Sequence, residues 1–385
     1  ARFYFGINTG GGTVTINANF GQRPFAYTAP SGFKALCTQN LPTPTIGATT
    51  ATQAGKFFNP VLYTGTGSDN RAVTGVGFQP DFVWVKGRDI GQSHVLNNAV
   101  AGVGTAKTLY SNLTVSQGTY DDYGYLQSLD SDGYTIKNGS INGNLVNASG
   151  YQYVAWNWKA NGSGSTNTAG SITSTVSANT TSGFSVATFT KNATTNETIG
   201  HGLGVAPQLI IVKARQNAGY NSWAVWHTSI GIGNYLELNT TVASTASSTI
   251  WNNTLPTSTV FSMGTASTST VNMVAYCFAP IAGYSAFGSY TGNGSADGPF
   301  VFTGFRPAFV MVKASSTTSA WIIFDTARDT YNVAGYEIYP NTSGAEAYYA
   351  DLDILSNGFK HRQSGSPNAS GVTYIYACFA QNPFK

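Results

Sequence analysis

The chain has 385 residues and a formal net charge of +3, and only 9 % of its residues are charged, against a usual share of about 25 %. The Lys and Arg residues form no run, which argues against nucleic-acid binding, and no apolar stretch approaches the roughly 20 residues that span a bilayer as a helix. Short β-branched and aromatic runs bounded by Gly, Asn, Asp and Pro fill the chain and predict an all-β protein.

Residues 1–39 contain strand-like runs that match nothing later in the sequence. Two of these runs, 19–25 and 30–36, resemble the closing strands of a SPRY-type β-sandwich. Because a whole SPRY domain is much longer, the resemblance implies that the chain starts inside such a domain and that Ala1 is not a natural start. Residues 40–56 are then interpreted as an extended linker.

After this linker the sequence repeats itself three times. Each copy has a Pro followed by an apolar run that ends in Lys six residues later, and the prolines Pro80, Pro207 and Pro307 lie 127 and 100 residues apart. An aromatic residue closes each copy at a similar distance from its lysine, and these residues are Trp158, Phe278 and Phe379. Such spacing indicates tandem copies of one fold.

We therefore predict three antiparallel β-sandwich repeats, each of roughly 100 residues. Repeat 1 is residues 57–160, repeat 2 is residues 181–280 and repeat 3 is residues 287–385, with a Gly/Ser/Thr-rich linker at 161–180. A slender array of sandwiches is expected. The lysines that end the apolar runs are expected to reach solvent with packed stems, and they are Lys86, Lys213 and Lys313.

Metal and catalytic sites receive little support from the residue patterns. The four histidines have no metal-binding spacing, His201 is expected to have a structural or solvent-facing role, and Asp130-Ser131-Asp132-Gly133 is a better match to a turn than to a calcium loop. Two carboxylate pairs, Asp121-Asp122 and Asp351-x-Asp353, could act as acid and base in a glycan hydrolase, but repeat 2 has no counterpart of either. We expect no enzyme, no metal and no cofactor.

Cysteines and glycosylation-type triplets complete this survey. Cys277 and Cys378 occupy equivalent positions in repeats 2 and 3, so they are expected to be buried and unpaired, and Cys37 has no obvious partner. Free thiols suit synthesis in a reducing cytoplasm. Asn-x-Ser/Thr triplets are attributed to chance in a chain so rich in these residues, and examples occur at Asn112, Asn147, Asn192, Asn239 and Asn368.

Several of these motifs together carry a resemblance to a known group. Four features resemble virion proteins of tailed bacteriophages, of the tail-fibre and adhesion type: the SPRY-like end, the Tyr-Thr-Gly turns at Tyr63 and Tyr290, the Gly-Phe-x-Pro-x-Phe-Val-x-Val-Lys phrase and the closing Tyr-x-x-Phe-Ala motif. The resemblance implies a place on the virion surface, outside the cell, after synthesis in the cytoplasm of the bacterial host. It supplies no catalytic residues.

Candidate binding residues lie in loops where the repeats differ most. Aromatic rings beside amide and hydroxyl groups suit sugar binding, because a pyranose stacks on a ring while its hydroxyls form directional hydrogen bonds. The candidate glycan- or receptor-contact residues are Tyr120, Tyr123, Tyr125, Tyr220, Trp223, Tyr331 and Tyr336. The cluster in 118–125 is the best of them, with the alternative that its tyrosines cap the sandwich core or an intersubunit contact.

The leading hypothesis is a non-enzymatic phage structural protein, a tail fibre or surface appendage that contributes to host-surface attachment. The alternatives are a carbohydrate-binding adhesin module and a capsid or filament coat protein without receptor binding. Expected partners are further copies of the chain in a homo-oligomer, for which a trimer is one possibility, other virion proteins and a host surface glycan. Neither nucleic acid nor membrane insertion is expected.

Overall fold

The computed structural model describes residues 44–383 apart from 48, 193–195 and 268. The predicted SPRY-like segment 1–39 and Cys37 lie outside the described residues. Within them the all-β prediction is confirmed, because antiparallel strands dominate and the α-helix recorded there is a single turn, α1 (Ser248–Trp251). No helix in this part of the chain is long and apolar enough to cross a membrane.

The same four-stranded antiparallel sheet is built three times, with equivalent strands in the same order. In repeat 1 the order is β1 (Phe58–Thr64), β7 (Gln152–Trp158), β3 (Phe82–Gly87) and β4 (Val95–Asn98). In repeat 2 it is β10 (Phe184–Lys191), β17 (Val271–Phe278), β12 (Leu209–Ala214) and β13 (Ala224–His227). In repeat 3 it is β18 (Ser285–Thr291), β25 (Thr373–Pro383), β20 (Phe305–Ala314) and β21 (Trp321–Asp325).

A smaller antiparallel sheet accompanies each of these. Repeat 1 has β2 (Arg71–Thr74), β6 (Gly133–Lys137) and β5 (Tyr125–Asp130), repeat 2 has β11 (Glu197–Gly200) and β16 (Val260–Met263), and repeat 3 has β19 (Phe300–Phe302), β24 (Gly358–His361), β23 (Ala347–Leu355) and β22 (Ala334–Glu337). In repeat 1 the two sheets bury one core between them, in which Leu126 and Tyr134 of the small sheet join Val83 and Val85 of β3. Each repeat is therefore a sandwich, and the apolar runs are strands buried on both faces.

The predicted linkers are structured, which corrects the sequence analysis. Within 161–180, β8 (Ser165–Asn167) pairs with β9 (Ser174–Asn179), and β9 pairs with β10. Together with β14 (Asn234–Glu237) and β15 (Thr245–Ala246), they widen the large sheet of repeat 2 to eight strands. The described part of 40–56 forms the 3-10 turns η2 (Thr50–Thr52) and η3 (Ala54–Lys56) and buries Ile46 and Ala54.

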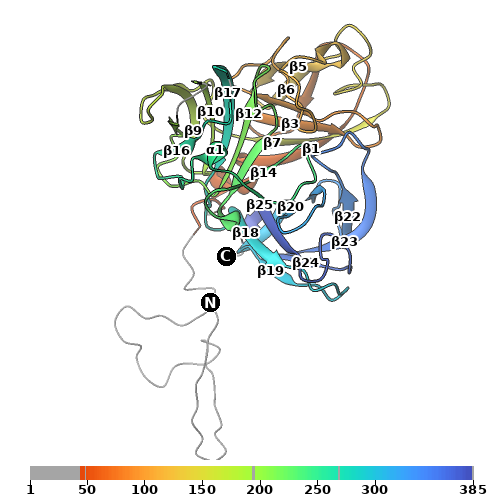
Figure 1. The fold of residues 1–385 in the computed structure, drawn as a ribbon. Helices are drawn as coiled ribbons and strands as arrows, with labels where there is room; N and C mark the ends of the chain where they lie inside the picture. Colours follow the sequence, from red (N-terminus) through yellow and green to blue (C-terminus); the bar gives the residue numbers. More distant parts are fainter. Residues whose placement is uncertain (1–43, 48, 193–195, 268, 384–385) are drawn as a thin grey trace, which may run out of the picture. The chain divides into compact units, whose positions relative to one another are not determined.

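The three repeats pack around one shared apolar centre. Their closing aromatic residues meet there, with ring centroids 6.3 Å apart for Trp158 and Phe278, 5.6 Å for Trp158 and Phe379, and 5.6 Å for Phe278 and Phe379. Figure 1 shows the repeats as three lobes, coloured orange, green to teal, and blue. The expected slender array is wrong, because residues 44–383 belong to one compact unit with approximate three-fold symmetry.

In each repeat, an equivalent side-chain ring nitrogen also forms a hydrogen bond with a backbone carbonyl of the preceding repeat. The pairs are Trp223 Nε1 with Tyr110 O at 2.9 Å, Trp321 Nε1 with Glu237 O at 2.9 Å, and His94 Nε2 with Tyr339 O at 3.1 Å. A backbone N–H of the preceding repeat donates to a second set of equivalent carbonyls, those of Arg88, Arg215 and Ser315. The contacts run from repeat 1 to 2, from 2 to 3 and from 3 back to 1, so the ring is closed.

The closure between repeats 3 and 1 carries a buried ionic network. Arg88 pairs with Glu346 at 2.7 Å, and Arg328 pairs with Glu346 at 3.4 Å and with Asp325 at 2.6 Å. Trp156 of repeat 1 donates its indole N–H to Asp325 at 3.0 Å. Two positive and two negative charges therefore balance across the one repeat interface that successive residues of the chain do not bridge.

The three equivalent lysines do not reach solvent, which corrects the sequence analysis. Lys86, Lys213 and Lys313 are at most 1 % exposed, and each ammonium donates to backbone carbonyls. Lys213 reaches Thr114 O of repeat 1 and Lys313 reaches Thr241 O of repeat 2, both at 3.2 Å. Burial lowers the pKa of each lysine to about 8.

Five of the Asn-x-Ser/Thr triplets begin at repeated structural positions, so chance does not explain these five. Asn112, Asn239 and Asn341 accept hydrogen bonds from the backbone N–H of the three equivalent ring residues, His94, Trp223 and Trp321. Asn147 and Asn368 are fully buried and hold equivalent turns after β1 and β18. Asn192 is exposed and its amide donates to Glu197.

Candidate functional site

A hollow of about 400 Å³ opens in repeat 1 beside the best cluster of predicted binding residues. It is lined by Gln92, Ser93, Asn112, Leu113, Tyr120, Tyr123 and Leu145, together with Ser343 of repeat 3. We call it the Tyr120 hollow. Tyr120 is 38 % exposed, and its ring packs edge-on against Tyr110 at 5.5 Å. The hollow therefore combines aromatic rings with amide and hydroxyl groups.

A short turn presents the two tyrosines of this hollow. The 3-10 turn η4 (Asp121–Tyr123) is anchored by Asp121, whose buried carboxylate accepts hydrogen bonds from the Ala106 N–H and the Tyr110 hydroxyl. Burial raises the pKa of Asp121. Gly124 ends the turn with a φ of 114°, and a Cβ there would lie 2.8 Å from Val146, so the backbone path requires glycine.

A second hollow, of about 420 Å³, opens in repeat 3. It is lined by Ser319, Ala320, Ile322, Glu337, Tyr339, Tyr349, Gln363, Gly365 and Ser366. We call it the Tyr349 hollow, because the ring of Tyr349 is 57 % exposed. Its composition again joins two tyrosines to hydroxyl and amide side chains, and it adds one carboxyl group.

The two hollows occupy the same place in their repeats. Three pairs of lining residues correspond, namely Gln92 with Ser319, Ser93 with Ala320, and Leu145 with Ser366. The first two pairs immediately precede His94 and Trp321, which make the same contacts with an asparagine and with the preceding repeat. The third pair lies two residues before Asn147 and Asn368, which hold equivalent turns. The same position of the sandwich therefore contains a hollow in repeat 1 and in repeat 3.

The carboxyl group of the Tyr349 hollow belongs to a buried acidic pair. Glu337 is 3 % exposed and Asp351 is 0 % exposed. The Tyr339 hydroxyl donates to Glu337 Oε2. The carboxyls of Glu337 and Asp351 also form a hydrogen bond with one another, and apart from this bond Glu337 Oε1 and both Asp351 carboxylate oxygens have no hydrogen-bond partner among the described residues. Burial and the adjacent Asp351 carboxyl raise the pKa of Glu337 to about 9, and burial raises the pKa of Asp351. Glu337 therefore keeps its proton at neutral pH.

The remaining predicted binding residues lie elsewhere. Trp223 is fully buried and holds repeat 1 through its indole N–H, so its prediction as a glycan contact is wrong. Tyr220 is half-buried and donates its hydroxyl to Glu237 at 3.0 Å. Tyr125 is half-buried and does not line the Tyr120 hollow, although its hydroxyl lies 3.4 Å from Thr105 Oγ1.

The loop predicted in repeat 3 also misses the hollow. Tyr331 is 86 % exposed, and the half-buried ring of Tyr336 faces the Arg88 guanidinium at 5.8 Å. Neither lines the Tyr349 hollow. The sequence analysis missed Tyr339 and Tyr349, yet Tyr339 lies two residues before Asn341, and the repeated asparagine could have identified this position.

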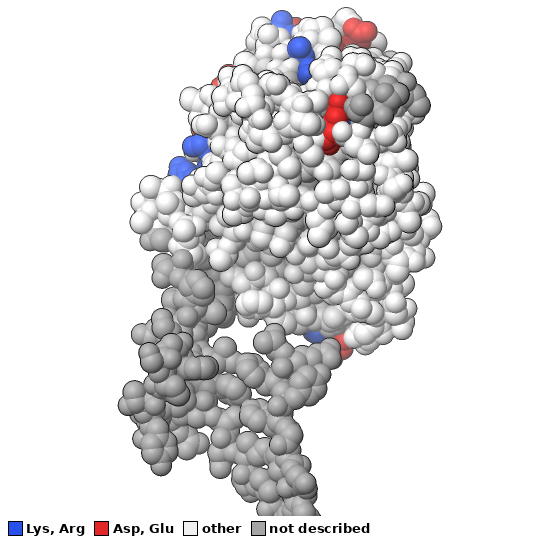
Figure 2. Space-filling model, turned by 60° about the vertical axis from the view of Figure 1, so that its left-hand side comes forward, with Lys and Arg blue, Asp and Glu red and all other residues white. Residues whose placement is uncertain are grey.

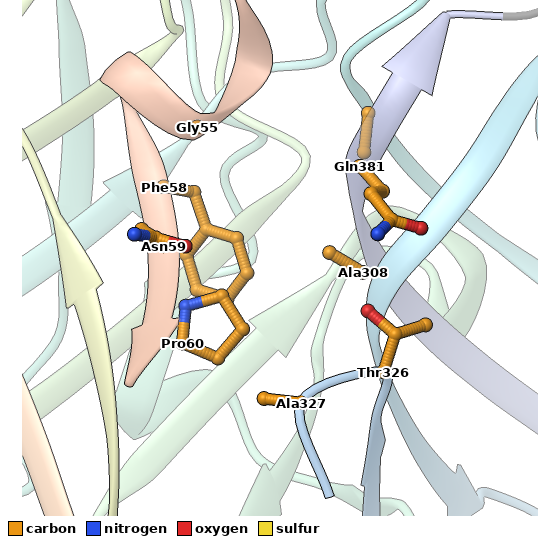
Figure 3. A pocket seen from close by; sticks show the side chains of 9 residues that line it. Gly55, Phe58, Asn59, Pro60, Ala308, Thr326, Ala327 and Gln381 are labelled. Atoms are coloured by element: carbon orange, nitrogen blue, oxygen red, sulfur yellow. The ribbon is translucent and has the colours of Figure 1, made fainter. Parts of the chain in front are cut away.

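A third hollow, of about 230 Å³, lies on the seam between repeats 1 and 3. Figure 3 shows Phe58 and Pro60 of β1 on one side and Ala308, Thr326 and Ala327 of repeat 3 on the other. Its one aromatic lining residue, Phe58, is only 1 % exposed, whereas Tyr120 and Tyr349 are 38 % and 57 % exposed. The seam is therefore a weaker candidate than the two tyrosine hollows.

In each of the two carboxylate pairs predicted as possible catalysts, the two carboxylates lie in different environments. Asp121 is the buried anchor of η4, whereas Asp122 is exposed and accepts from Ser140 Oγ at 2.6 Å. Asp351 is buried beside Glu337, whereas Asp353 pairs with Arg362 at 3.3 Å. The acidic pair that the structure does bring together, Glu337 with Asp351, is separated by 14 positions in the sequence and was not predicted.

Histidines, cysteines and the predicted turn have structural roles. All four histidines are buried, and burial lowers the pKa of His227 to about 4 and of His361 to about 3. Cys277 and Cys378 are buried and free, as predicted. The predicted turn at Asp130–Gly133 joins β5 and β6, and Asp132 accepts from the backbone N–H of Gly75 and Gly77.

One face of the molecule is poor in charged side chains. On the face drawn in Figure 2, Lys, Arg, Asp and Glu side chains are few and scattered, and uncharged side chains cover most of the area. Such a surface offers little long-range attraction for a charged partner.

Comparison with known proteins identifies the family of the chain. Residues 53–383 match the family described as "Domain of unknown function (DUF7483)", and the chain belongs to this family. No curated protein and no solved structure matches the chain.

Proposed function

We propose that this chain is a non-enzymatic attachment protein that binds glycans through the Tyr120 and Tyr349 hollows. The observation that carries the proposal is the repetition: two hollows of about 400 and 420 Å³ occupy equivalent places in two repeats, and each is lined by two tyrosines beside hydroxyl and amide groups. Packing alone does not require this, because repeat 2 closes its core with α1, where Ile250 and Trp251 are buried.

The chemistry of the linings matches a sugar. A pyranose presents an apolar C–H face, which stacks on a tyrosine ring, and a rim of hydroxyls, which exchange hydrogen bonds with amide and hydroxyl side chains. The volumes fall within the range of small-ligand pockets, about 300–1,000 Å³. Tyr120 and Tyr349 are exposed, while Gln92, Gln363 and Ser319 supply donors and acceptors.

The setting that we propose is the surface of a phage particle, as a tail fibre or other appendage that contributes to host attachment. The support is the resemblance of the repeat motifs to phage virion proteins and the low charge of the chain. The buried free thiols of Cys277 and Cys378 suit synthesis in the reducing cytoplasm of a bacterial host. In that setting the chain would assemble with further copies of itself and with other virion proteins.

The test is glycan binding by the full chain and by single-tyrosine variants. We expect the wild type to bind on a glycan array and Tyr120→Ala and Tyr349→Ala each to weaken binding at their own hollow by about tenfold, the value of one aromatic stacking contact of about 1–1.5 kcal/mol. Tyr331→Ala is the matched control, because Tyr331 is 86 % exposed and lines neither hollow.

Two results would overturn the proposal. Absence of binding to every glycan would favour a coat protein without receptor binding. Equal losses for the control and for the two hollow variants would show that the tyrosines of the hollows do not form the binding site.

A further inference from the structure

We propose that the Tyr349 hollow selects a sugar that carries a protonated primary amine, with the ammonium seated on Glu337 and Asp351, whereas the Tyr120 hollow takes a neutral sugar. This inference rests on the proposed glycan-binding function and names the ligand class of one of its two sites.

The first argument is the set of unused acceptors beside this hollow. Glu337 lines it and is 97 % buried, and Asp351 is fully buried beside Glu337. Apart from the hydrogen bond that the two carboxyls make with one another, three of their four oxygens have no hydrogen-bond partner among the described residues. An alkylammonium carries three N–H donors, so one such group can satisfy acceptors that are otherwise costly to bury.

The second argument concerns the charged groups nearby. Arg328, the cation whose charge acts on Glu337, is already committed to Asp325 at 2.6 Å and to Glu346 at 3.4 Å. Tyr339 donates to Glu337, and Tyr349 brings a second phenol to the hollow. The aromatic rings add attraction for a cation, so the lining favours an ammonium over a neutral amide or hydroxyl.

The third argument is the contrast between the equivalent hollows. The Tyr120 hollow has no Asp or Glu among its lining residues, and its Leu145 stands where the Tyr349 hollow has Ser366. A divalent cation is a poorer match to the acidic pair, because Ca²⁺ takes six to eight oxygen ligands and the described residues contain no group of three His, Cys, Asp or Glu suited to a metal. Two carboxyls beside aromatic rings fit an ammonium better.

Binding would displace a proton. Glu337 holds its proton at neutral pH, since burial and Asp351 raise its pKa to about 9. An ammonium that replaces this proton as the partner of the two carboxyls stabilises the ionised form of Glu337. The O–H bond of Glu337 then breaks and the proton passes to the buffer, so binding below pH 9 releases up to one proton for each ligand.

The experiment is isothermal titration of the full chain with three probes: a hexosamine with a free amine, its N-acetylated form and the parent hexose. At a pH where the free amine is protonated, we expect the hexosamine to bind at least tenfold more tightly than the N-acetylated form. Titration in buffers of different ionisation enthalpy should show proton release for the hexosamine alone.

Variants separate this site from the rest of the protein. Glu337→Gln should abolish both the preference and the proton release, and Asp351→Asn should weaken the preference, with folding of each checked by far-UV circular dichroism. Tyr331→Ala is the matched control, because Tyr331 lines neither hollow, and it should leave the preference unchanged.

Other outcomes would overturn the inference. Equal binding of the three probes, or an unchanged preference in folded Glu337→Gln, would remove the ammonium site while leaving the glycan function intact if binding still depends on Tyr349. Binding of Ca²⁺ alone that is lost in Glu337→Gln would make this a metal site. If none of the three sugars and no glycan on the array binds, the proposed function itself fails.

Discussion

Replacing Glu337 by Gln should stabilise the protein at neutral pH. Folding moves the pKa of Glu337 from 4.5 to about 9. The folded state therefore holds a proton that the unfolded state releases, and the stability that depends on it is fully present below pH 4.5 and is lost as the pH rises towards 9. At 1.36 kcal/mol per pKa unit the full effect is about 6 kcal/mol. Because Glu337 and Asp351 titrate together, only part of this effect belongs to Glu337. We therefore expect Glu337→Gln to raise the free energy of unfolding by about 2–4 kcal/mol at pH 8.

The assay is urea unfolding of wild type and Glu337→Gln at pH 4, 6 and 8, with the difference in free energy of unfolding plotted against pH. The difference should be close to zero at pH 4, because the protonated carboxyl and the amide have similar shapes and both can donate to Asp351. Asp297→Asn is the control of opposite sign, because the exposed Asp297 pairs with Lys360 at 2.8 Å and the pKa of Asp297 is lowered. A constant difference from pH 4 to pH 8 would refute the reasoning, since it would mean that Glu337 does not retain its proton on folding.

Three further substitutions test the contacts between repeats and one of the repeated turns. Glu346→Gln removes the shared partner of two arginines at the interface of repeats 3 and 1. It should lower the free energy of unfolding by about 3 kcal/mol, as expected for a broken buried ion pair. A loss of less than about 0.5 kcal/mol in urea unfolding would contradict the role of this network. Lys213→Met removes a lysine whose pKa is lowered on folding from 10.5 to about 8. The stability of the wild type should therefore rise between pH 8 and 10.5, and the variant should lack this rise. Urea unfolding of both proteins at about pH 7 and pH 10 checks this. Asn368→Ala deletes four hydrogen bonds of a fully buried amide and should cost about 2–4 kcal/mol, whereas an unchanged melting temperature would show that this turn holds without the asparagine.

The sequence was sufficient to predict the elements but not their assembly. The apolar runs between Pro and Lys could be assigned to central strands because a proline precedes each run and a lysine ends it. Their recurrence in three copies shows which residues of the three strands are equivalent. The contacts that close the ring, such as Trp223 with the carbonyl of Tyr110, leave no pattern in the sequence because the acceptor is a backbone oxygen, which every residue type supplies. The same reason explains the error on Lys213, whose carbonyl partner Thr114 belongs to another repeat.

The candidate site was predicted in part for a related reason. Tyr120 and Tyr123 could be recognised because aromatic rings in a polar loop near a turn are unusual, and they do line a hollow. Trp223 has the same local signature, yet its ring fills an interface that only the three-fold packing creates. Glu337 and Asp351 come from two strands of a β-sheet, and their pairing depends on how those strands register, which single-sequence patterns do not specify.

Backbone-mediated contacts also explain how one chain can carry two hollows of different chemistry. At the ring interfaces His94 stands where the other repeats have Trp223 and Trp321, and the contact survives because each ring nitrogen meets a backbone carbonyl. The scaffold thus constrains few side chains at the edge of each hollow. One copy can then hold Leu145 in a neutral lining while the other places Glu337 in the lining of its hollow. Divergence of ligand preference between the two hollows is the expected result of a fold whose repeats are joined mainly through main-chain atoms and a shared aromatic centre.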